Sequence, residues 1–512
     1  MRTATPSDHL DVLIVGAGLS GIGAACHLER DCPDQRYALL EARDAIGGTW
    51  DLFRYPGVRS DSDMHTMGYS FAPWEDPRTL ADGASILSYI RTTARRHGVT
   101  DHVRCGRRVL RAAFDTAAAR WTVEVERSDT GEIEPITCRF LLMCTGYYRY
   151  DHGYTPRFPG TERFAGRIVH PQRWPRDLSC AGQRVVVIGS GATAVTLVPA
   201  LADAGAQVTM VQRSPTYVIS LPSRDPLAEV ARRRLPATLA YRAVRAKNVA
   251  LMVASYQLCR RRPRLARAAI RKGVTAALPA GYAVDTHFNP SYEPWDQRLC
   301  FCPDNDLFGA VSSGRARIVT AEVETFTEHG LTLRGGEEID ADVIVTATGL
   351  ALRALGGATL TVDGRAVSLR DTVAYKGMML SGVPNFALTM GYTNASWTLK
   401  ADLTSRYVCR LLDHMRDHGY AICRPAPADP AMERAPLIGL HSGYVRRSIA
   451  DFPSQGTRRP WRVRQNYPLD ALELRLGRLE DGVMWFSAAA PPPVPAPAPA
   501  PAAEAPEPLA AP

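Results

Sequence analysis

Two glycine-rich loops hold the residues whose types and spacing most directly predict chemistry. One spans residues 16–21 and the other residues 189–195, and each lies between a short apolar strand and a stretch with helical spacing. In that context a loop brings backbone amides and a helix N-terminus to the phosphates of a dinucleotide. The residues assigned to these phosphates are Gly16, Gly18, Ser20 and Gly21 in the first loop and Gly189, Ser190, Gly191, Ala192, Thr193, Ala194 and Val195 in the second. Two such loops predict two dinucleotide-binding sites.

Each glycine-rich loop with its flanking strands and helix forms one unit, the first around residues 16–21 and the second around residues 189–195. The residue that follows the second strand of each unit distinguishes the two dinucleotides. Glu41 ends a short apolar strand twenty residues beyond Gly21, where a carboxylate accepts hydrogen bonds from ribose hydroxyls. In the second unit the strand 208–211 leads instead to Arg213 and Ser214. A guanidinium at this position matches a 2′-phosphate, which indicates NADPH in the second site.

A further pair of glycines indicates that the first dinucleotide is FAD. Gly47 and Gly48 follow Glu41 closely, and paired glycines just after the ribose acid are typical of flavoproteins. Val109, on a later strand, falls where flavoproteins with two dinucleotide sites pair a strand backbone with adenine. An ordinary core valine is the alternative at that position.

A fourth pattern lies between the two loops and reads Phe164-x-Gly166-x₃-His170-x₃-Trp174-Pro175. It matches the fingerprint of Baeyer–Villiger monooxygenases. Over residues 10–487 the chain resembles class B flavin monooxygenases, and especially the ethionamide-activating Baeyer–Villiger monooxygenases of actinobacteria. The segments that carry this closer resemblance are 295–300, 374–382 and 391–400. The alternative for the fingerprint is a surface linker with a solvated histidine.

The resemblance implies roles for particular residues. Thr49, Trp50, Asp51 and Leu52 would run along the flavin. Asp61 would lie near its reactive edge and orient Arg298, which would stabilise the anion of a C4a-peroxyflavin. His170 and Trp174 would couple domain movement to catalysis rather than touch substrate.

The sequence leaves other interpretations of the two catalytic candidates open. Asp61 lies between two serines, so it could be an aspartate that caps a turn. Arg298 could pair with Asp296 or Asp304. Gln297 stands where many members of the family have a lysine that contacts the NADP phosphate, which puts the details of that contact in doubt.

The activity implied by the resemblance is NADPH- and O₂-dependent oxygenation of ketones to esters, with S-oxygenation of thioamides and sulfides. One rival is a flavin monooxygenase that oxidises only nitrogen and sulfur centres. Another is a non-catalytic flavoprotein sensor. Members of the first class usually lack Trp-Pro at the end of the fingerprint and an equivalent of Arg298. The second would retain FAD but would not need Arg213 and Arg298 together.

The expected fold is α/β, with two Rossmann-like dinucleotide-binding domains and a helical insertion. We expect an FAD-binding domain from residues 8–150 and 340–487, and an NADPH-binding domain from residues 151–220 and 286–339. A basic helical insertion would span residues 221–285, and a disordered Pro- and Ala-rich tail residues 488–512.

Composition and charge limit the cellular setting. The chain has 512 residues, is 46% hydrophobic, and contains no apolar run of membrane-spanning length and no signal peptide, so we expect a cytoplasmic protein with reduced cysteines and no metal site. Residues 224–275 carry 14 Arg or Lys and two acids. This segment is either a solvated subdomain that helps to close the substrate site or a peripheral attachment to an anionic membrane. No nucleic-acid-reading motif accompanies the charge, so we expect no nucleic-acid partner.

Overall fold

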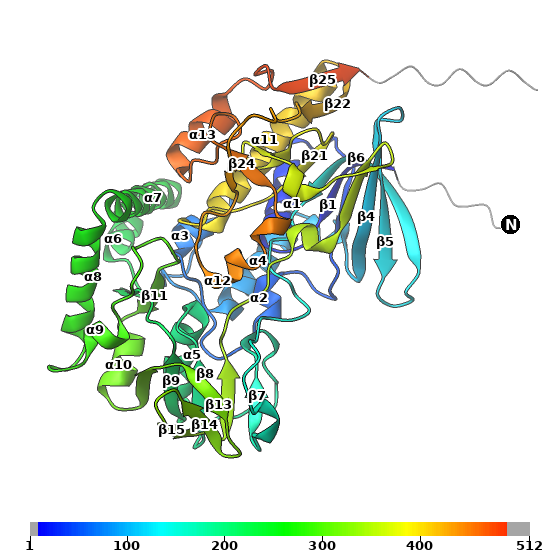
Figure 1. Ribbon diagram of the computed structural model, residues 1–512. Helices are drawn as coiled ribbons and strands as arrows, with labels where there is room; N and C mark the ends of the chain where they lie inside the picture. The colour runs from blue at the N-terminus through cyan, green and yellow to red at the C-terminus, as the bar shows by residue number, and fades with distance from the viewer. Residues whose placement is uncertain (1–8, 489–512) are drawn as a thin grey trace, which may run out of the picture.

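Two β-sheets organise the computed structural model, which describes residues 9–488 (Figure 1). The tail expected over residues 488–512 lies outside the described residues, apart from Ala488. The expected α/β class, with two parallel Rossmann-like cores and a helical insertion, is confirmed.

The first sheet has nine strands in the order β18-β17-β4-β5-β6-β1-β2-β3, with β21 also paired to β6. Their bounds are β1 His9–Val15, β2 Tyr37–Leu40, β3 Val103–Arg104, β4 Arg107–Asp115, β5 Arg120–Arg127, β6 Ile133–Met143, β17 Thr359–Val362, β18 Arg365–Ala366 and β21 Phe386–Leu388. In β1, Val12 and Ile14 pack against helices α1 (Leu19–Asp31) and α11 (Trp397–Asp417), while Leu13 and Val15 enter the core on the other face. Both faces are therefore covered, as expected for parallel strands.

The second sheet has five parallel strands in the order β12-β9-β8-β16-β7. Their bounds are β7 Arg167–Val169, β8 Arg184–Ile188, β9 Gln207–Gln212, β12 Ala316–Thr320 and β16 Val343–Thr346. Val185 and Val187 of β8 share a core with helices α5 (Ala192–Asp203) and α10 (Asp306–Ser312). Val186 and Ile188 share another core with the antiparallel sheet of β13 (Val323–Phe326), β14 (Gly330–Leu333) and β15 (Glu338–Asp340).

Shorter elements connect these layers. The helices among them are α2 Thr49–Leu52, α3 Met64–Met67, α4 Gly83–Arg96, α12 Gly443–Arg446 and α13 Tyr467–Leu476. The strands pair as β10 Val218–Leu221 with β11 Cys300–Pro303, β19 Ala374–Tyr375 with β20 Met379–Leu380, β22 Tyr420–Pro425 with β25 Met484–Ala488, and β23 Arg434–Pro436 with β24 Ser454–Gly456.

The chain crosses between the sheets twice, and the two crossings lie side by side. Tyr148 bridges Leu352, the Arg149 amide donates to the Ala351 carbonyl at 2.8 Å, and the Tyr154 amide donates to the Gly349 carbonyl at 3.0 Å. The return crossing begins after β16, which pairs with β8 and β7 in the second sheet. The boundary expected at residue 340 is therefore several residues too early, because the strand that follows it completes the second sheet.

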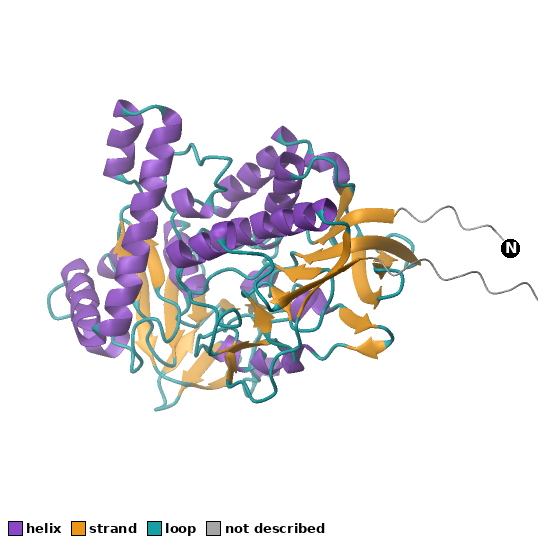
Figure 2. Ribbon diagram, turned by 90° about the horizontal axis from the view of Figure 1, so that it is seen from above, coloured by secondary structure: helices purple, strands orange, loops and turns teal. Residues whose placement is uncertain are grey.

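The basic insertion is helical and lies on the opposite side of the molecule from strands β4 and β5 (Figures 1 and 2). Its helices are α6 Pro226–Arg234, α7 Ala237–Arg261, α8 Pro263–Ala277 and α9 Val284–His287. Within residues 9–488, no helix has both the length and the apolar character needed to cross a membrane.

Gly57 brings the loop after α2 against helix α5 of the second unit. A Cβ at Gly57 would lie 2.3 Å from the Thr196 carbonyl oxygen and 2.8 Å from the Ala200 side chain, and its φ is +78°. Only a residue without a side chain fits between these two units at this point.

We expect Gly57→Ala to lower the midpoint of thermal unfolding more than Gly182→Ala does. Gly182 has a φ of +74° and open space around its Cβ position, so both variants incur the conformational cost of about 1 kcal/mol. Gly57→Ala adds a clash that costs about 1–3 kcal/mol. Equal midpoints for the two variants would contradict a close contact at Gly57.

Candidate active site

A cavity of about 550 Å³ is lined by segments from both units, a volume usual for ligand-binding sites. The sequence-assigned residues on its wall are Gly16, Gly18, Ser20, Glu41, Gly48, Thr49, Trp50, Asp61, Val109, Ala192, Thr193 and Arg298. Those that do not line it are Gly21, Asp51, Leu52, Gly189, Ser190, Gly191, Ala194, Val195, Arg213 and Ser214. The structure thus gathers the first loop, both catalytic candidates and the start of α5 around one space.

The first glycine loop is shaped by close backbone contacts. A Cβ at Gly16 would lie 2.7 Å from the Cys144 carbonyl oxygen, and one at Gly21 would lie 1.8 Å from the Gly16 carbonyl oxygen. Helix α1 starts after Gly18 with no side chain capping its first amides. These amides remain for an anionic ligand in the cavity, so the loop fits a dinucleotide phosphate.

Glu41 is buried at the end of β2 and is fixed by the backbone. Its carboxylate accepts hydrogen bonds from the amides of Ala17 at 2.9 Å and Arg43 at 3.0 Å. Burial raises the pKa of Glu41, and the two backbone bonds only partly oppose this rise. The Arg107 amide donates to the Glu41 carbonyl oxygen at 2.8 Å, which joins β2 to β4 and places Val109 on the same cavity wall.

Asp51 has three arginine partners instead of a position on the cavity wall. Its buried carboxylate contacts Arg43 at 2.7 Å and both Arg54 and Arg91 at 3.0 Å. These ion pairs fix α2, whose neighbours Thr49 and Trp50 do line the cavity. A direct contact between Asp51 and the flavin stays a prediction.

Arg298 and Asp61 form a bidentate ion pair on the cavity wall. Arg298 Nε lies 2.7 Å from Asp61 Oδ2, and Arg298 Nη2 donates to Asp61 Oδ1 at 3.0 Å. The side chains are 27% and 36% exposed, because they border the cavity. Arg298 therefore pairs with Asp61 rather than with Asp296 or Asp304. A two-point contact fixes the plane of the guanidinium as well as its distance.

Tyrosine side chains surround this ion pair. Burial lowers the pKa of Arg298, but the charge of Asp61, followed by interactions with Tyr147, Tyr148 and Tyr444, outweighs burial and raises it. Burial likewise raises the pKa of Tyr148 and of Tyr444, so these phenols stay neutral. Arg298 is therefore the fixed positive charge of this part of the wall.

The second glycine loop, like the first, is shaped by close contacts between backbone atoms. Gly189 has a φ of +137°, and a Cβ there would lie 2.3 Å from the Ala347 carbonyl oxygen. Helix α5 begins after Gly191 without a side-chain cap, so its first amides also face a ligand. Arg213 and Ser214 are exposed just beyond β9, and Ser190 Oγ donates to the Ser214 carbonyl oxygen at 3.0 Å.

The fingerprint residues lie outside the cavity and contact the second sheet and the crossing. Gly166 lets the chain approach the Asp342 carbonyl, and Phe164 packs on Phe326. His170 Nε2 donates to the Gly349 carbonyl oxygen at 3.1 Å, while its Nδ1 accepts from the Gln172 amide at 3.2 Å. Burial lowers the pKa of His170, which favours this neutral tautomer.

The rest of the fingerprint is packed rather than solvated. Trp174 is partly buried against the core that includes α5, and Pro175 is also half-buried. With His170 bound to Gly349, the fingerprint contacts the return crossing between the two sheets. A surface linker with a solvated histidine does not describe it.

Comparisons with known proteins agree with this architecture. A family described as flavin-binding monooxygenase-like matches residues 10–240. FAD-containing monooxygenase EthA of Mycobacterium tuberculosis is 52% identical over 487 residues, which cover 95% of this chain and 99% of that protein. EthA of Mycolicibacterium smegmatis is 49% identical over 482 residues, which cover 94% and 98% respectively.

The chain belongs to the flavin-binding monooxygenase-like family. The fold is also that of an oxidized steroid monooxygenase bound to NADP, with a TM-score of 0.67 at 24% identity over 82% of this chain and 88% of that one. The resemblance inferred from the motifs is thereby confirmed.

Helix α7 of this monooxygenase holds the segments that carry the ion pair. Asn248 Nδ2 donates to Asp63 Oδ1 at 2.9 Å, two residues after Asp61. Arg260 Nη1 donates to Asp296 Oδ1 at 2.8 Å, two residues before Arg298. One helix therefore contacts both loops whose side chains must meet.

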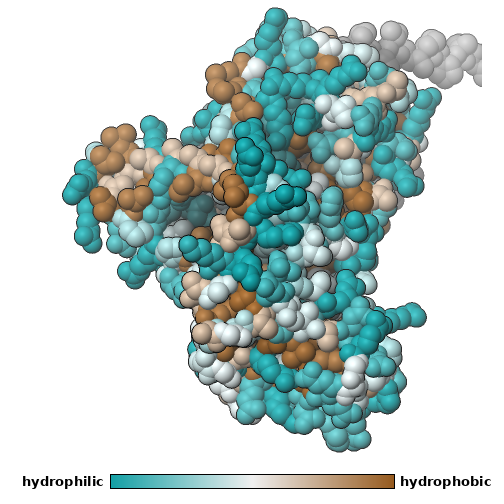
Figure 3. All heavy atoms as spheres, turned by 60° about the vertical axis from the view of Figure 1, so that its left-hand side comes forward, coloured by the Kyte–Doolittle hydropathy of each residue, from teal (hydrophilic) through white to brown (hydrophobic). Residues whose placement is uncertain are grey.

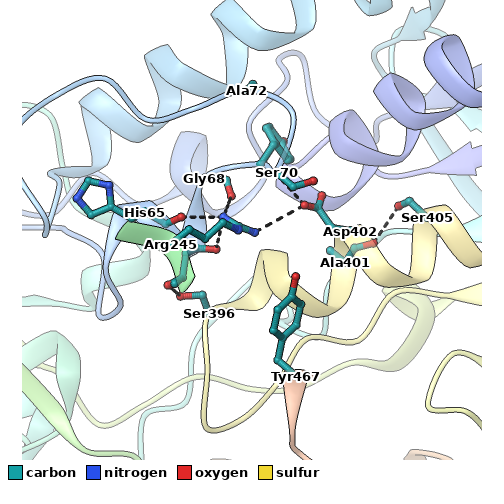
Figure 4. A network of polar contacts seen from close by, with 12 residues as sticks. His65, Gly68, Ser70, Ala72, Arg245, Ser396, Ala401, Asp402, Ser405 and Tyr467 are labelled. Atoms are coloured by element: carbon teal, nitrogen blue, oxygen red, sulfur yellow. Dashed lines mark hydrogen bonds and ion pairs between the residues drawn. The ribbon is translucent and has the colours of Figure 1, made fainter. Parts of the chain in front are cut away.

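A buried network strengthens the first of these attachments (Figure 4). Arg245 of α7 donates to the carbonyl oxygens of His65 at 2.7 Å and Gly68 at 2.8 Å and lies 3.8 Å from Asp402 of α11. Burial raises the pKa of Asp402, but His27 and then Arg245 outweigh it and lower the pKa, so the carboxylate stays charged. The network ties the insertion to the first unit.

The network continues to the cavity wall. Thr66 of α3 and Ser396 share a hydrogen bond of 2.6 Å, and Ser396 precedes the first residue of α11, Trp397. Trp397 Nε1 donates to Ser20 Oγ at 2.7 Å, and both residues line the cavity. Packing of α7 is thus linked by hydrogen bonds to the part of the cavity wall formed by Ser20 and Trp397.

Several wall residues were missed by sequence reasoning. Tyr147 and Tyr148 lie just beyond the carboxyl end of β6, a position that could have marked them, because ligands bind at the carboxyl ends of parallel strands. Arg59, whose Nη1 donates to Asp306 Oδ2 at 2.6 Å, belongs to the turn before Asp61 but was assigned no role from the sequence. The cavity wall also includes Tyr55, Tyr150 and Arg353, to which the sequence assigned no role.

We expect Arg260→Ala to lower monooxygenase turnover about threefold to tenfold, because freeing Asp296 loosens the loop before Arg298. The exposed ion pair itself contributes only about 0–1 kcal/mol, so thermal stability should change little. Arg271→Ala is the matched control, because it removes an exposed pair with Asp285 in the same insertion. Equal turnover of the two variants would exclude the positioning role.

Proposed function

We propose that the protein is an FAD-containing, NADPH- and O₂-dependent Baeyer–Villiger monooxygenase. It converts ketones to esters and also S-oxygenates thioamides and sulfides. The observation that supports this most is the bidentate Asp61–Arg298 pair, which holds a cation at the wall of the dinucleotide cavity. The rival that oxidises only nitrogen and sulfur has no need of a fixed cation there.

The residues of the first unit fit FAD. Gly16, Gly18 and the uncapped start of α1 would hold the pyrophosphate, and Glu41 the ribose. Gly48, Thr49 and Trp50 would lie along the remainder. When bound, the flavin accepts hydride from NADPH and activates O₂.

The residues of the second unit fit NADPH. The uncapped start of α5 after Gly191 would take the pyrophosphate, and Arg213, exposed beyond β9, would take the 2′-phosphate. Ser214 would add a hydroxyl beside it. Thr193 lies on the cavity wall, which supports a position for this cofactor beside the first one.

Arg298 would stabilise negative charge on the oxygen that attacks the ketone carbonyl. A cation that is already fixed in place stabilises developing charge without the cost of reorganisation. Asp61 fixes the plane of the guanidinium, and the neutral Tyr148 and Tyr444 near it add no competing charge. A protonated oxygen would instead transfer to a soft sulfur centre, so sulfide oxidation depends less on the cation.

We expect Arg298→Ala to keep bound flavin and its reduction by NADPH but to lower ester formation from a simple ketone by about 10²–10³-fold. Sulfoxide formation from a sulfide should fall less. Arg298→Lys keeps the charge without the two-point contact, so its rate of ester formation should lie between those of the wild type and Arg298→Ala. Ester and sulfoxide are measured by gas chromatography. Undiminished ester formation in Arg298→Ala would contradict the proposal. A wild-type protein that oxidises sulfide but no ketone would favour the monooxygenase that acts only on nitrogen and sulfur centres.

We expect Arg213→Gln to raise the KM for NADPH about 10-fold or more while changing the KM for NADH little, because only NADPH carries the 2′-phosphate. Steady-state oxidation of the two coenzymes by the same preparation provides the internal control. Parallel rises in both KM values would mean that Arg213 supports the fold of the loop rather than the phosphate.

A further inference from the structure

The solvent-facing side of helix α7 is apolar. Residues Leu239, Ala243, Ala246, Ala250, Ala254 and Leu258 are all exposed. They recur every three or four residues, so they form one stripe along the helix. Leu251 lies beside this stripe and is 61% exposed. A surface helix normally turns polar residues outward, so an apolar stripe on the outer side of α7 departs from that pattern.

Helix α7 cannot rotate about its axis to bury this stripe, because its inner side is already bonded to the first unit. Tyr241 and Arg245 are buried there and donate to backbone carbonyls of the first unit, and Val244 and Val249 are also buried. The helix orientation is therefore fixed by the same contacts that hold the catalytic loops. The leucines stay outside, and Figure 3 shows hydrophobic surface on the projecting part of this side of the molecule.

Exposed arginines flank the stripe, and several of them form no ion pair within residues 9–488. Helices α7 and α8 contain no Asp or Glu. Within the described chain, no ion pair joins a carboxylate to any of the exposed arginines near the two ends of α7, which are Arg233, Arg234, Arg242, Arg261, Arg262 and Arg264. The face thus combines apolar side chains with uncompensated positive charge.

We propose that this outer face of α7 docks on the surface of an anionic lipid bilayer. The stripe would lie in the interface, and the flanking arginines would contact the headgroups, the arrangement of a helix that lies on a membrane without spanning it. Each cation near an anionic surface strengthens binding about fivefold. The proposal goes beyond the oxygenation reaction and does not depend on its substrate.

Charge argues against a second copy of the chain as the occupant. A symmetric dimer through this face would bring the same arginines of both copies together, and the whole chain already carries +9. A bilayer with acidic headgroups offers the opposite charge and an apolar layer beneath it. It therefore satisfies both features of the face.

The test is flotation of the flavin-loaded, full-length protein with vesicles of phosphatidylcholine alone or with about one-third phosphatidylglycerol. We expect binding to the anionic vesicles, its loss at high salt, and little binding to neutral ones. Leu251→Glu with Leu258→Glu should lower the bound fraction about tenfold or more, and Arg261→Gln with Arg264→Gln by a similar factor.

Ile133→Glu is the matched control. The side chain of Ile133 is 58% exposed, a fraction similar to the 61% of Leu251. Ile133 begins β6, however, on the far side of the molecule. This variant should bind anionic vesicles like the wild type, and all variants should keep bound flavin in the absence of vesicles, which shows that they fold.

Three outcomes would overturn the proposal. The leucine variant could bind as well as the wild type, or Ile133→Glu could weaken binding equally. Alternatively, sedimentation could reveal a dimer that the leucine substitutions dissociate, with no binding to vesicles. The last result would assign the stripe to a contact between copies of this chain.

Discussion

The ion pair between Asp61 and Arg298 joins parts of the chain that are 237 residues apart, and much of the structure serves to keep them together. Gly57 lets the loop before Asp61 approach the second unit. Helix α7 contacts the neighbours of both partners through Asn248 and Arg260. A salt bridge on an open surface would contribute little, but at a cavity wall its geometry decides where positive charge stands.

What could be predicted from the sequence was local in origin. Gly16 and Gly189 indicate tight turns, since their positive φ angles exclude most side chains. The adjoining strands and helices have clear hydrophobic periodicities. The Asp61–Arg298 pair was reachable only through resemblance to a family, since nothing near either residue specifies the other.

The rest depends on contacts between distant segments. Asp51 looks like a cofactor residue within its motif, yet its carboxylate pairs with three arginines, of which Arg91 lies 40 residues away in α4. The strand at 343–346 is obvious as a strand, but only its pairing with β8 and β7 reveals which sheet it completes. Likewise, helical spacing in α7 does not reveal that Arg245 lies on the buried side of the helix and that Leu251 and Leu258 lie on the exposed side.

The paired crossings between the two sheets have a mechanical consequence. A single connecting strand would allow the sheets to swivel about its bonds, whereas two strands bonded side by side at Tyr148 and Leu352 make a ribbon that resists twisting. We therefore expect relative movement of the two sheets to bend this ribbon rather than to twist it. His170 grips the ribbon at Gly349, where that bend would be felt first.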